Sequence, residues 1–248
     1  NYKADEIAFI ASPYSTLEDN FVLQRFAKEI VGTDNIVYIP NIEGEDEKLL
    51  LRADKTPNAN GLKLLGIDPI NTKFIDKILN KQFKMVYIMN DSLGRLERTE
   101  EIAKSIEIAV LHISNFYEQS HKATVVLPAA TYAEINGTFV NFRNRIQRIK
   151  PAAATLEQER LPGDFAVSRL DKFGSHNDRW TKGTRFNARP AWKVISQMAK
   201  VLGSEFGYDN TEEVFDDMAS KIPALAGMSY EVIGTHGAVV GRTEEVAV

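Results

Sequence analysis

Short apolar runs alternate with helix-forming segments through the N-terminal half of the chain, and this alternation constrains the fold more than any other feature. Each run is rich in Ile, Val, Leu or Phe and stops at a proline or a polar residue, as expected for strands that are buried on both faces. Strands separated by helices predict right-handed βαβ units, and therefore a mostly parallel sheet. The predicted strands are residues 7–11, 36–39, 83–89, 106–113 and 124–128.

The first helix is predicted directly after the first strand. Thr16 or Ser15 can cap its N-terminus. Glu18 and Asp19 fall in its first turn, where a negative charge interacts favourably with the helix dipole. Apolar residues then recur at helical spacing up to Gly32, which is placed as a C-terminal cap.

The segments between the later strands are mixed. Residues 43–54 are charged, and we expect an exposed helix or loop there. Residues 56–66 are rich in Pro, Asn and Gly, which predicts a functional loop or a connector. Asn71 can cap a further helix, and another helix is expected around residues 96–104.

The pattern changes in the second half of the chain. Residues 137–149 alternate in places, which predicts extended or hairpin structure. Residues 151–190 have no sustained periodicity, so we expect an arm that lies on a partner or on the domain surface. One amphipathic helix is predicted to open at residues 189–192, and another is predicted to start at residues 211–213.

These patterns predict the α/β fold class, with a mostly parallel twisted sheet, helices on both faces, and an irregular and helical C-terminal extension. We place the α/β domain at residues 1–150, and an extended arm with C-terminal helices packing on it at residues 151–248. A chain of 248 residues can bury roughly 70–75% of the surface that it exposes when unfolded. Neither a disulfide nor a metal is therefore needed for stability.

Composition excludes several kinds of site. The chain has no cysteine, so it cannot hold a thiolate zinc site, a Cys nucleophile or a Cys-ligated iron–sulfur cluster. Its net charge of −4 argues against non-specific binding of nucleic acid. No apolar run approaches the roughly 18–20 residues of a membrane span, and we expect no signal peptide at the polar N-terminus. The first residue is Asn1, which fits either normal processing or a domain cut from a longer polypeptide.

Searches for common catalytic motifs find none. The chain has no G-x-G-x-x-G turn after a strand and no Walker A loop. Its histidines have no partner at helical spacing, and we interpret each as a surface or packing residue rather than a metal ligand. They are His112, His121, His176 and His236.

Two local features remain open between a structural and a functional interpretation. Asn90 and Asp91 end an apolar strand, where open α/β sheets bind ligands, but spacing alone favours a plain turn. Residues 141–150 hold four cations and no acid. In extended conformation, Arg143, Arg145 and Gln147 would share one face, while Arg148 and Lys150 would share the other. Arginine forks suit phosphates or carboxylates, and a solvated charged strand is equally compatible with this composition.

A longer motif connects these features. Residues 124–134 read TVVLPAATYAE, and Gly137, Thr138, Asn141, Arg145 and Gln147 follow. This stretch resembles the molybdopterin oxidoreductase superfamily, whose pattern is a V-L-P-A-A strand and turn, a glutamate, and then G-T-x-x-N-x-E-G-R-x-Q. Within the superfamily the chain most resembles the large iron–sulfur subunit of proton-pumping NADH:quinone oxidoreductase, respiratory complex I. Further matching stretches, in the same order, are residues 9–35, 60–67, 85–91, 188–195 and 206–237.

The chain departs from the family pattern at two adjacent positions of this motif. Arg143 stands where the family has an acidic residue, and Asn144 stands where it has a glycine that would permit close backbone approach. The cysteines of the family's N-terminal iron–sulfur region and its C-terminal β-barrel are also missing. We therefore expect no catalytic residue, no metal and no cofactor in this chain. The resemblance marks Asn90, Thr138, Asn141, Arg145 and Gln147 as candidates for a vestigial pterin site.

The resemblance implies a non-catalytic structural and docking domain in an oxidoreductase complex that carries electrons from NADH to quinone. Its partners would be other hydrophilic-arm subunits, with iron–sulfur clusters in the N-terminal part of the parent. The complex would be cytoplasmic and peripheral to the inner face of the plasma membrane, with no direct insertion of this chain. Docking to partners is expected from the apolar residues of the arm: Leu161, Phe165, Phe173 and Trp180.

Two alternatives to this interpretation differ in what the chain binds. The first is a fragment of a molybdenum or tungsten oxidoreductase, similar to formate dehydrogenase, whose five candidate residues hold a pterin dinucleotide. The second is a stand-alone binding module that uses the cations of residues 141–150 for an anionic partner.

Overall fold

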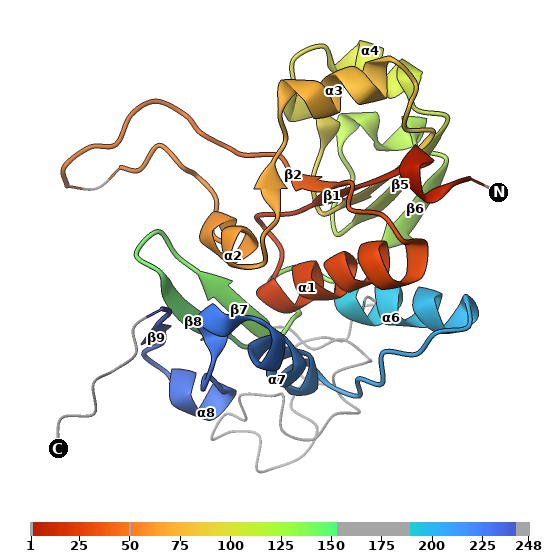
Figure 1. Cartoon of the computed structure of the whole chain (residues 1–248). Coiled ribbons are helices and arrows are strands. Elements are labelled where there is room, and N and C mark those ends of the chain that lie inside the picture. The colour runs from red at the N-terminus through yellow and green to blue at the C-terminus, as the bar shows by residue number, and fades with distance from the viewer. Residues whose placement is uncertain (1, 50, 153–188, 242–248) are drawn as a thin grey trace, which may run out of the picture.

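The centre of the molecule is a six-stranded sheet in which every neighbouring pair of strands is parallel. The computed structural model describes residues 2–49, 51–152 and 189–241. The strand order is β3-β2-β1-β4-β5-β6 (Figure 1). The predicted parallel sheet is confirmed. Its strands are β1 (Ile7–Ala11), β2 (Ile36–Tyr38), β3 (Asp68–Pro69), β4 (Met85–Met89), β5 (Ile108–Ile113) and β6 (Val125–Pro128).

Helices cover both faces of the sheet, as Figure 1 shows. One face carries α1 (Leu17–Arg25), which continues into the π-helical η2 (Phe26–Val31), and α6 (Ala191–Val201). The other face carries α3 (Thr72–Leu79) and α4 (Thr99–Ser105). Side chains alternate along each strand, so β1 contributes Phe9 and Ala11 to one core and Ala8 and Ile10 to the other.

A second, antiparallel sheet lies beside the first. It consists of β7 (Gly137–Val140), β8 (Arg145–Ile149) and β9 (Ala238–Val239), in that order. The hairpin predicted for residues 137–149 is therefore confirmed. The domain boundary that we placed at residue 150 separates β8 from β9, and both strands belong to this sheet. Nearby are α7 (Thr211–Lys221) and α8 (Tyr230–Ile233). The short 3-10 helices are η1 (Ala4–Glu6), η3 (Leu93–Arg95), η4 (Glu118–Lys122) and η7 (Pro223–Leu225).

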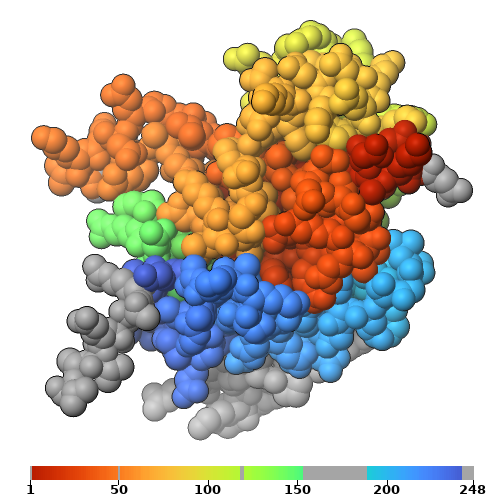
Figure 2. All heavy atoms as spheres, in the orientation of Figure 1, coloured from red at the N-terminus to blue at the C-terminus, as the bar shows by residue number. Residues whose placement is uncertain are grey.

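The segment between β2 and β3 agrees with its prediction in one part and differs in another. Residues 43–49 and 51–54 form no helix, which agrees with the loop alternative, and they leave the body of the molecule as a protrusion, coloured orange in Figure 2. Residues 56–66, predicted as a loop, contain α2 (Ala59–Leu64). The cause is tertiary: the buried Asn58 before α2 donates to the Ser15 carbonyl and accepts from the Val140 amide. The sequence around Asn58 contains no pattern that predicts these distant partners.

Two buried acids at the start of α1 hold distant parts of the chain: Glu18 contacts the second sheet and Asp19 contacts α6. Glu18 is fully buried, and its carboxylate accepts hydrogen bonds from the Thr138 amide at 2.8 Å, the Thr138 hydroxyl at 3.0 Å and the Tyr230 hydroxyl at 2.7 Å. Asp19 accepts from the Trp192 amide at the N-terminus of α6 at 2.8 Å. Burial raises the pKa of Glu18 to about 7. We call Glu18 and Asp19 the α1 clamp.

The close approach of β7 to α1 requires a glycine. A Cβ atom at Gly137 would lie 2.6 Å from Cγ2 of Thr16 and 2.9 Å from a carboxylate oxygen of Glu18. Both distances are shorter than van der Waals contact, so a larger residue here would push β7 away from the α1 clamp.

Candidate functional site

The central sheet changes direction between β1 and β4, where successive strands are added on opposite sides. In open α/β sheets the loops that leave such a switch point diverge and form a crevice at the carboxyl ends of the strands. The structure has a cavity of about 590 Å³ at this place, which we call the switch-point pocket. Its lining comes from the segments after β1, β4 and β5 and from residues 130–135: Tyr14, Ser15, Asn90, Asp91, Ser92, Gly94, Arg95, Ser114, Asn115, Tyr117, Ala130, Tyr132 and Ile135.

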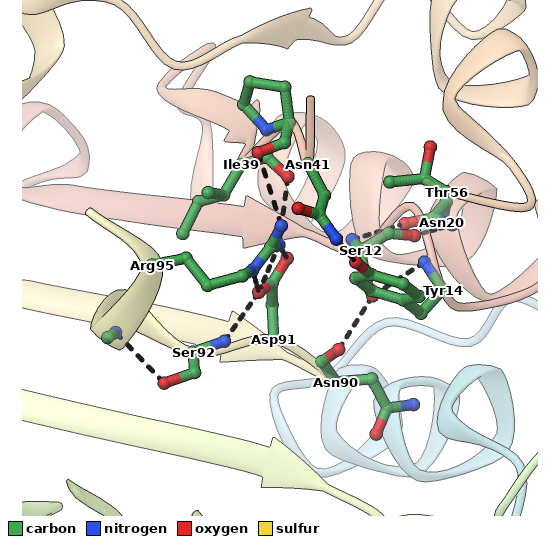
Figure 3. A network of polar contacts seen from close by, with 12 residues as sticks. Ser12, Tyr14, Asn20, Ile39, Asn41, Thr56, Asn90, Asp91, Ser92 and Arg95 are labelled. Carbon is green, nitrogen blue, oxygen red and sulfur yellow. Dashed lines mark hydrogen bonds and ion pairs between the residues drawn. The ribbon is translucent and has the colours of Figure 1, made fainter. Parts of the chain in front are cut away.

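Asn90 ties the ends of three strands together. Its Nδ2 donates to Oγ of Ser15 at 3.0 Å, and its Oδ1 accepts from the Ser114 amide at 2.9 Å. Its carbonyl accepts from the Ser12 hydroxyl at 2.8 Å (Figure 3). Its φ of 41° lies in the left-handed region, which asparagine tolerates better than most residues. Asn90 is therefore both a turn residue and part of the ligand-binding edge of the sheet, and its side-chain amide is already engaged.

The buried Asp91 forms an ion pair with Arg95, which is partly exposed, in the lining of the pocket. Nη2 of Arg95 lies 2.6 Å from each carboxylate oxygen of Asp91. The same guanidinium donates to the carbonyls of Ile39 at 3.0 Å and Pro40 at 3.3 Å, so it fastens the segment after β4 to the end of β2 (Figure 3). Burial raises the pKa of Asp91 to about 6, and Arg95 opposes that shift. The pair as a whole adds no net charge to the pocket.

The rest of the lining is neutral and partly aromatic. Tyr14 accepts from Nδ2 of Asn41 at 2.7 Å, and the guanidinium of Arg95 lies 5.3 Å from the centre of its ring. Tyr117 and Tyr132 contribute further rings, and the Tyr117 hydroxyl has no hydrogen-bond partner within the residues that the structure describes. Rings and hydroxyl groups of this kind suit a flat ring or a sugar.

The structure engages the other predicted pterin-site residues in contacts within the protein. Thr138 is buried against the α1 clamp. Oδ1 of Asn141 accepts from the amides of Arg143 and Arg145 and so holds the hairpin turn. Nη1 of Arg145 donates to the carbonyls of His236 and Gly237 at 3.1 and 3.0 Å. Gln147 is exposed on β8. Asn141, Arg145 and Gln147 are thus brought together on one hairpin, whereas Asn90 lies at the edge of the other sheet.

The tip of the hairpin corrects one expectation. Arg145 and Gln147 do share a face of β8, but Arg143 lies in the turn, where its guanidinium is 5.2 Å from the ring centre of Phe142. Asn144 has a φ of 56°. This position therefore needs a residue that tolerates the left-handed region, which explains the glycine of the family pattern without any close approach to a ligand.

A chain of hydrogen bonds connects this hairpin to the switch-point pocket. Ser15 accepts from Asn90 through its hydroxyl and from Asn58 through its carbonyl, and Asn58 accepts from the Val140 amide. Nδ2 of Asn60 also donates to the Asn141 carbonyl at 3.0 Å. The two groups of predicted residues are therefore structurally coupled through the start of α2.

Metal and membrane sites are not found among residues 2–49, 51–152 and 189–241: they contain no group of three potential metal ligands and no helix long and apolar enough to cross a bilayer. His112 is buried, with Nδ1 2.6 Å from the Tyr87 hydroxyl, and burial lowers its pKa to about 4. It is therefore a neutral packing residue, as predicted. The docking candidates Leu161, Phe165, Phe173 and Trp180, like His176, lie outside the described residues.

Sequence reasoning missed most of the residues around the pocket. Ser15 and Ser114 hold Asn90, and Arg95 neutralises Asp91, yet no motif marks them for these roles. One available signal is that Ser12 and Ser114 directly follow apolar strands, as Asn90 does. Polar residues after three parallel strands meet at one edge of the sheet.

Comparison with known proteins matches part of the chain to one family. Residues 61–160 match the family model "Molybdopterin oxidoreductase", and this stretch includes all five predicted pterin-site residues. The alpha subunit of F420-dependent formate dehydrogenase 2 of Methanococcus maripaludis is 31% identical over 163 residues, which are 63% of this chain and 20% of that protein. The corresponding subunit of Methanocaldococcus jannaschii is 27% identical over 163 residues, with the same coverage.

The chain spans about a fifth of the length of these curated relatives. Both relatives are named as formate dehydrogenase subunits, not as subunits of an NADH:quinone oxidoreductase. The family match over residues 61–160 and these relatives show that this part of the chain is similar to molybdopterin oxidoreductases.

Proposed function

We propose that this chain is an α/β domain of a formate dehydrogenase-like oxidoreductase, and that its switch-point pocket receives the terminal nucleoside of a molybdopterin dinucleotide. The similarity to formate dehydrogenase subunits carries the proposal. The formate dehydrogenase-like interpretation is therefore favoured over that of a subunit of an NADH:quinone oxidoreductase. On this proposal the domain works within a larger oxidoreductase assembly, and the redox chemistry belongs to the metal that the cofactor carries.

The geometry of the pocket supports an uncharged ring and a sugar. Tyr14, Tyr117 and Tyr132 surround it with aromatic surface, and Ser15 and Asn115 add neutral polar groups. A nucleoside offers a flat ring and hydroxyl groups that match this donor set. The volume of about 590 Å³ is in the range of small-molecule sites.

The diphosphate of such a cofactor fits the pocket less well. Among the described residues that line it, the one cation is Arg95, and its charge is used by Asp91. The nearby start of α1 carries the acids Glu18 and Asp19, which offset the positive end of the helix dipole. We therefore assign only the nucleoside part to this pocket, and the phosphates to charges elsewhere in the parent protein.

The test is the pterin content of the purified native protein and of two variants. Asn115→Trp places a large side chain at an exposed position of the pocket lining, whereas Phe116→Trp changes the exposed neighbour, which does not line the pocket. The wild-type protein and Phe116→Trp should release a fluorescent pterin on denaturation, and Asn115→Trp should retain at least roughly tenfold less. Equal pterin content in both variants would place the cofactor elsewhere.

A cofactor-free architectural domain, similar to part of the large iron–sulfur subunit of an NADH:quinone oxidoreductase, is the second candidate. Its support is that Asn90, Thr138 and Arg145 use their polar groups within the protein, and that Arg143 replaces the family's acid. In this role the chain would dock hydrophilic-arm subunits at the inner face of the plasma membrane. The iron–sulfur clusters would then lie in other parts of the complex. Absence of pterin and of molybdenum or tungsten from the intact native complex would favour this candidate.

A further inference from the structure

A second cavity lies beneath α4, beside the switch-point pocket. It exists because the connection from β5 to β6 contains only the five-residue 3-10 helix η4, whereas the connection from β4 to β5 carries α4. So short a helix leaves space beside Ala109 and Leu111 on one face of β5. The resulting cavity has a volume of about 270 Å³, and we call it the α4 cavity.

The walls of the α4 cavity are mostly apolar. Ile88, Leu93, Ala103, Ile106 and Leu111 contribute them from β4, η3, α4 and β5. Asp91 also lines the cavity, but its carboxylate is satisfied by Arg95 and by the Ser92 amide. The interior therefore favours an apolar group, and the Asp91 carboxylate does not need a cation from a ligand.

Two carboxylates of the lining, Asp91 and Glu100, are paired with Arg95 and Lys104, and the other polar side chains of the lining are hydroxyl and ammonium groups. The Ser120 hydroxyl accepts from the Tyr117 amide at 2.8 Å and has its own proton left to donate. Within the described part of the chain, neither the Tyr117 hydroxyl nor the ammonium group of Lys122 has a partner. Lys104 lies 3.7 Å from Glu100, and both side chains are largely exposed. Hydrogen-bond donors and ammonium groups around an apolar cavity favour a ligand that has an anionic acceptor at one end.

We propose that the α4 cavity binds a compact apolar carboxylate, with a single aromatic ring or a branched aliphatic body inside and the carboxylate at the mouth beside Lys122. The volume is below the usual range of drug-sized pockets, which limits the body to about one ring. This site is separate from the proposed pterin site: the two cavities share Asp91, Ser92 and Tyr117 as a dividing wall.

Binding of phenylacetate to the full chain, followed by calorimetry or ligand-observed NMR, tests the proposal. Phenylacetamide has the same ring and no charge. Ala103→Leu fills the cavity from α4, Lys122→Gln removes the charge at its mouth, and Lys73→Gln on α3 is the matched control on an exposed lysine. We expect saturable binding of phenylacetate. It should weaken at least tenfold in Ala103→Leu and roughly fivefold in Lys122→Gln, and it should be unchanged in Lys73→Gln. Binding of phenylacetamide should not change in Lys122→Gln.

Absence of saturable binding by the wild-type chain would overturn the proposal, as would equal affinity in Ala103→Leu. If Ala103→Leu does not fold, chemical-shift changes in the wild-type chain decide: shifts at Ala109 and Leu111 support the site, and shifts confined to other residues refute it. Neither outcome bears on the pterin content of the native protein.

Discussion

The molecule buries carboxylates in two regions, the α1 clamp and the Asp91–Arg95 pair, and it stabilises them in different ways. In the clamp, Glu18 accepts hydrogen bonds from Thr138 and Tyr230, which are neutral and lie 120 and 212 residues away. In the pair, Asp91 meets a cation four residues away. The clamp holds distant parts of the chain together, whereas the pair shapes one edge of the sheet. A buried acid thus serves assembly of the fold in the first region and the form of the candidate site in the second.

The largest expected effect comes from removing the clamp. Glu18→Ala leaves the buried Thr138 amide and Tyr230 hydroxyl without their acceptor, and it opens a cavity between the sheets. We expect a loss of about 3 kcal/mol in the free energy of unfolding at pH 6, since each orphaned buried donor costs about 1–3 kcal/mol. Urea unfolding measures it, with the exposed Glu100→Ala as control. A loss no larger than the control's would show that the clamp does not join the two sheets.

The pH dependence of stability separates the two regions. The pKa of Glu18 is raised from 4.5 to about 7 on folding, so its contribution is complete below about pH 4.5 and is lost as the pH rises through 7. Between pH 5 and 7 we expect stability to fall by about 2 kcal/mol. Glu18→Gln stays neutral and should remove this slope. The slope from Asp91, whose pKa rises from 3.8 to about 6, lies at lower pH and should remain. An unchanged slope above pH 6 in Glu18→Gln would contradict this assignment.

The smallest effect is expected from a conservative change in the pair. Arg95→Lys keeps the charge but loses the fork that contacts both oxygens of Asp91 and the carbonyls of Ile39 and Pro40. Because a lysine cannot make these bonds together, we expect a loss of about 1 kcal/mol. Arg98→Lys, in an exposed pair with Glu101, is the control and should change stability by less than about 0.5 kcal/mol. If the two substitutions reduce stability equally, the forked contacts of the Arg95 guanidinium do not contribute to stability.

The parallel sheet could be predicted from the sequence because its strands are continuous apolar runs that need no knowledge of their partners. The α1 clamp could not. Glu18 and Asp19 fit a local role in the first turn of a helix, and they do lie there. Their burial depends on Thr138, Tyr230 and Trp192, and nothing in the sequence around α1 indicates these partners.

The candidate site likewise combines residues that the sequence indicates with contacts that depend on the fold. Asn90 is marked in the sequence because it ends a strand, a local signal that the structure bears out. The contacts of Asn90 with Ser15 and Ser114 depend on the order of strands in the sheet, which periodicity does not determine. Asn141, Arg145 and Gln147 of the family motif lie on one hairpin because they are close in sequence. The motif does not show that Arg145 is held by carbonyls of the C-terminal segment.

The proposed binding of the terminal nucleoside of a pterin cofactor in the switch-point pocket is tested most directly by a structure of the purified native protein, determined by crystallography or electron cryomicroscopy. We predict density for a nucleoside at the carboxyl ends of β1, β4 and β5, in contact with Tyr117 and Ser15. A bound pterin cofactor with its nucleotide outside this pocket would contradict the claim, as would a native complex that contains no pterin at all.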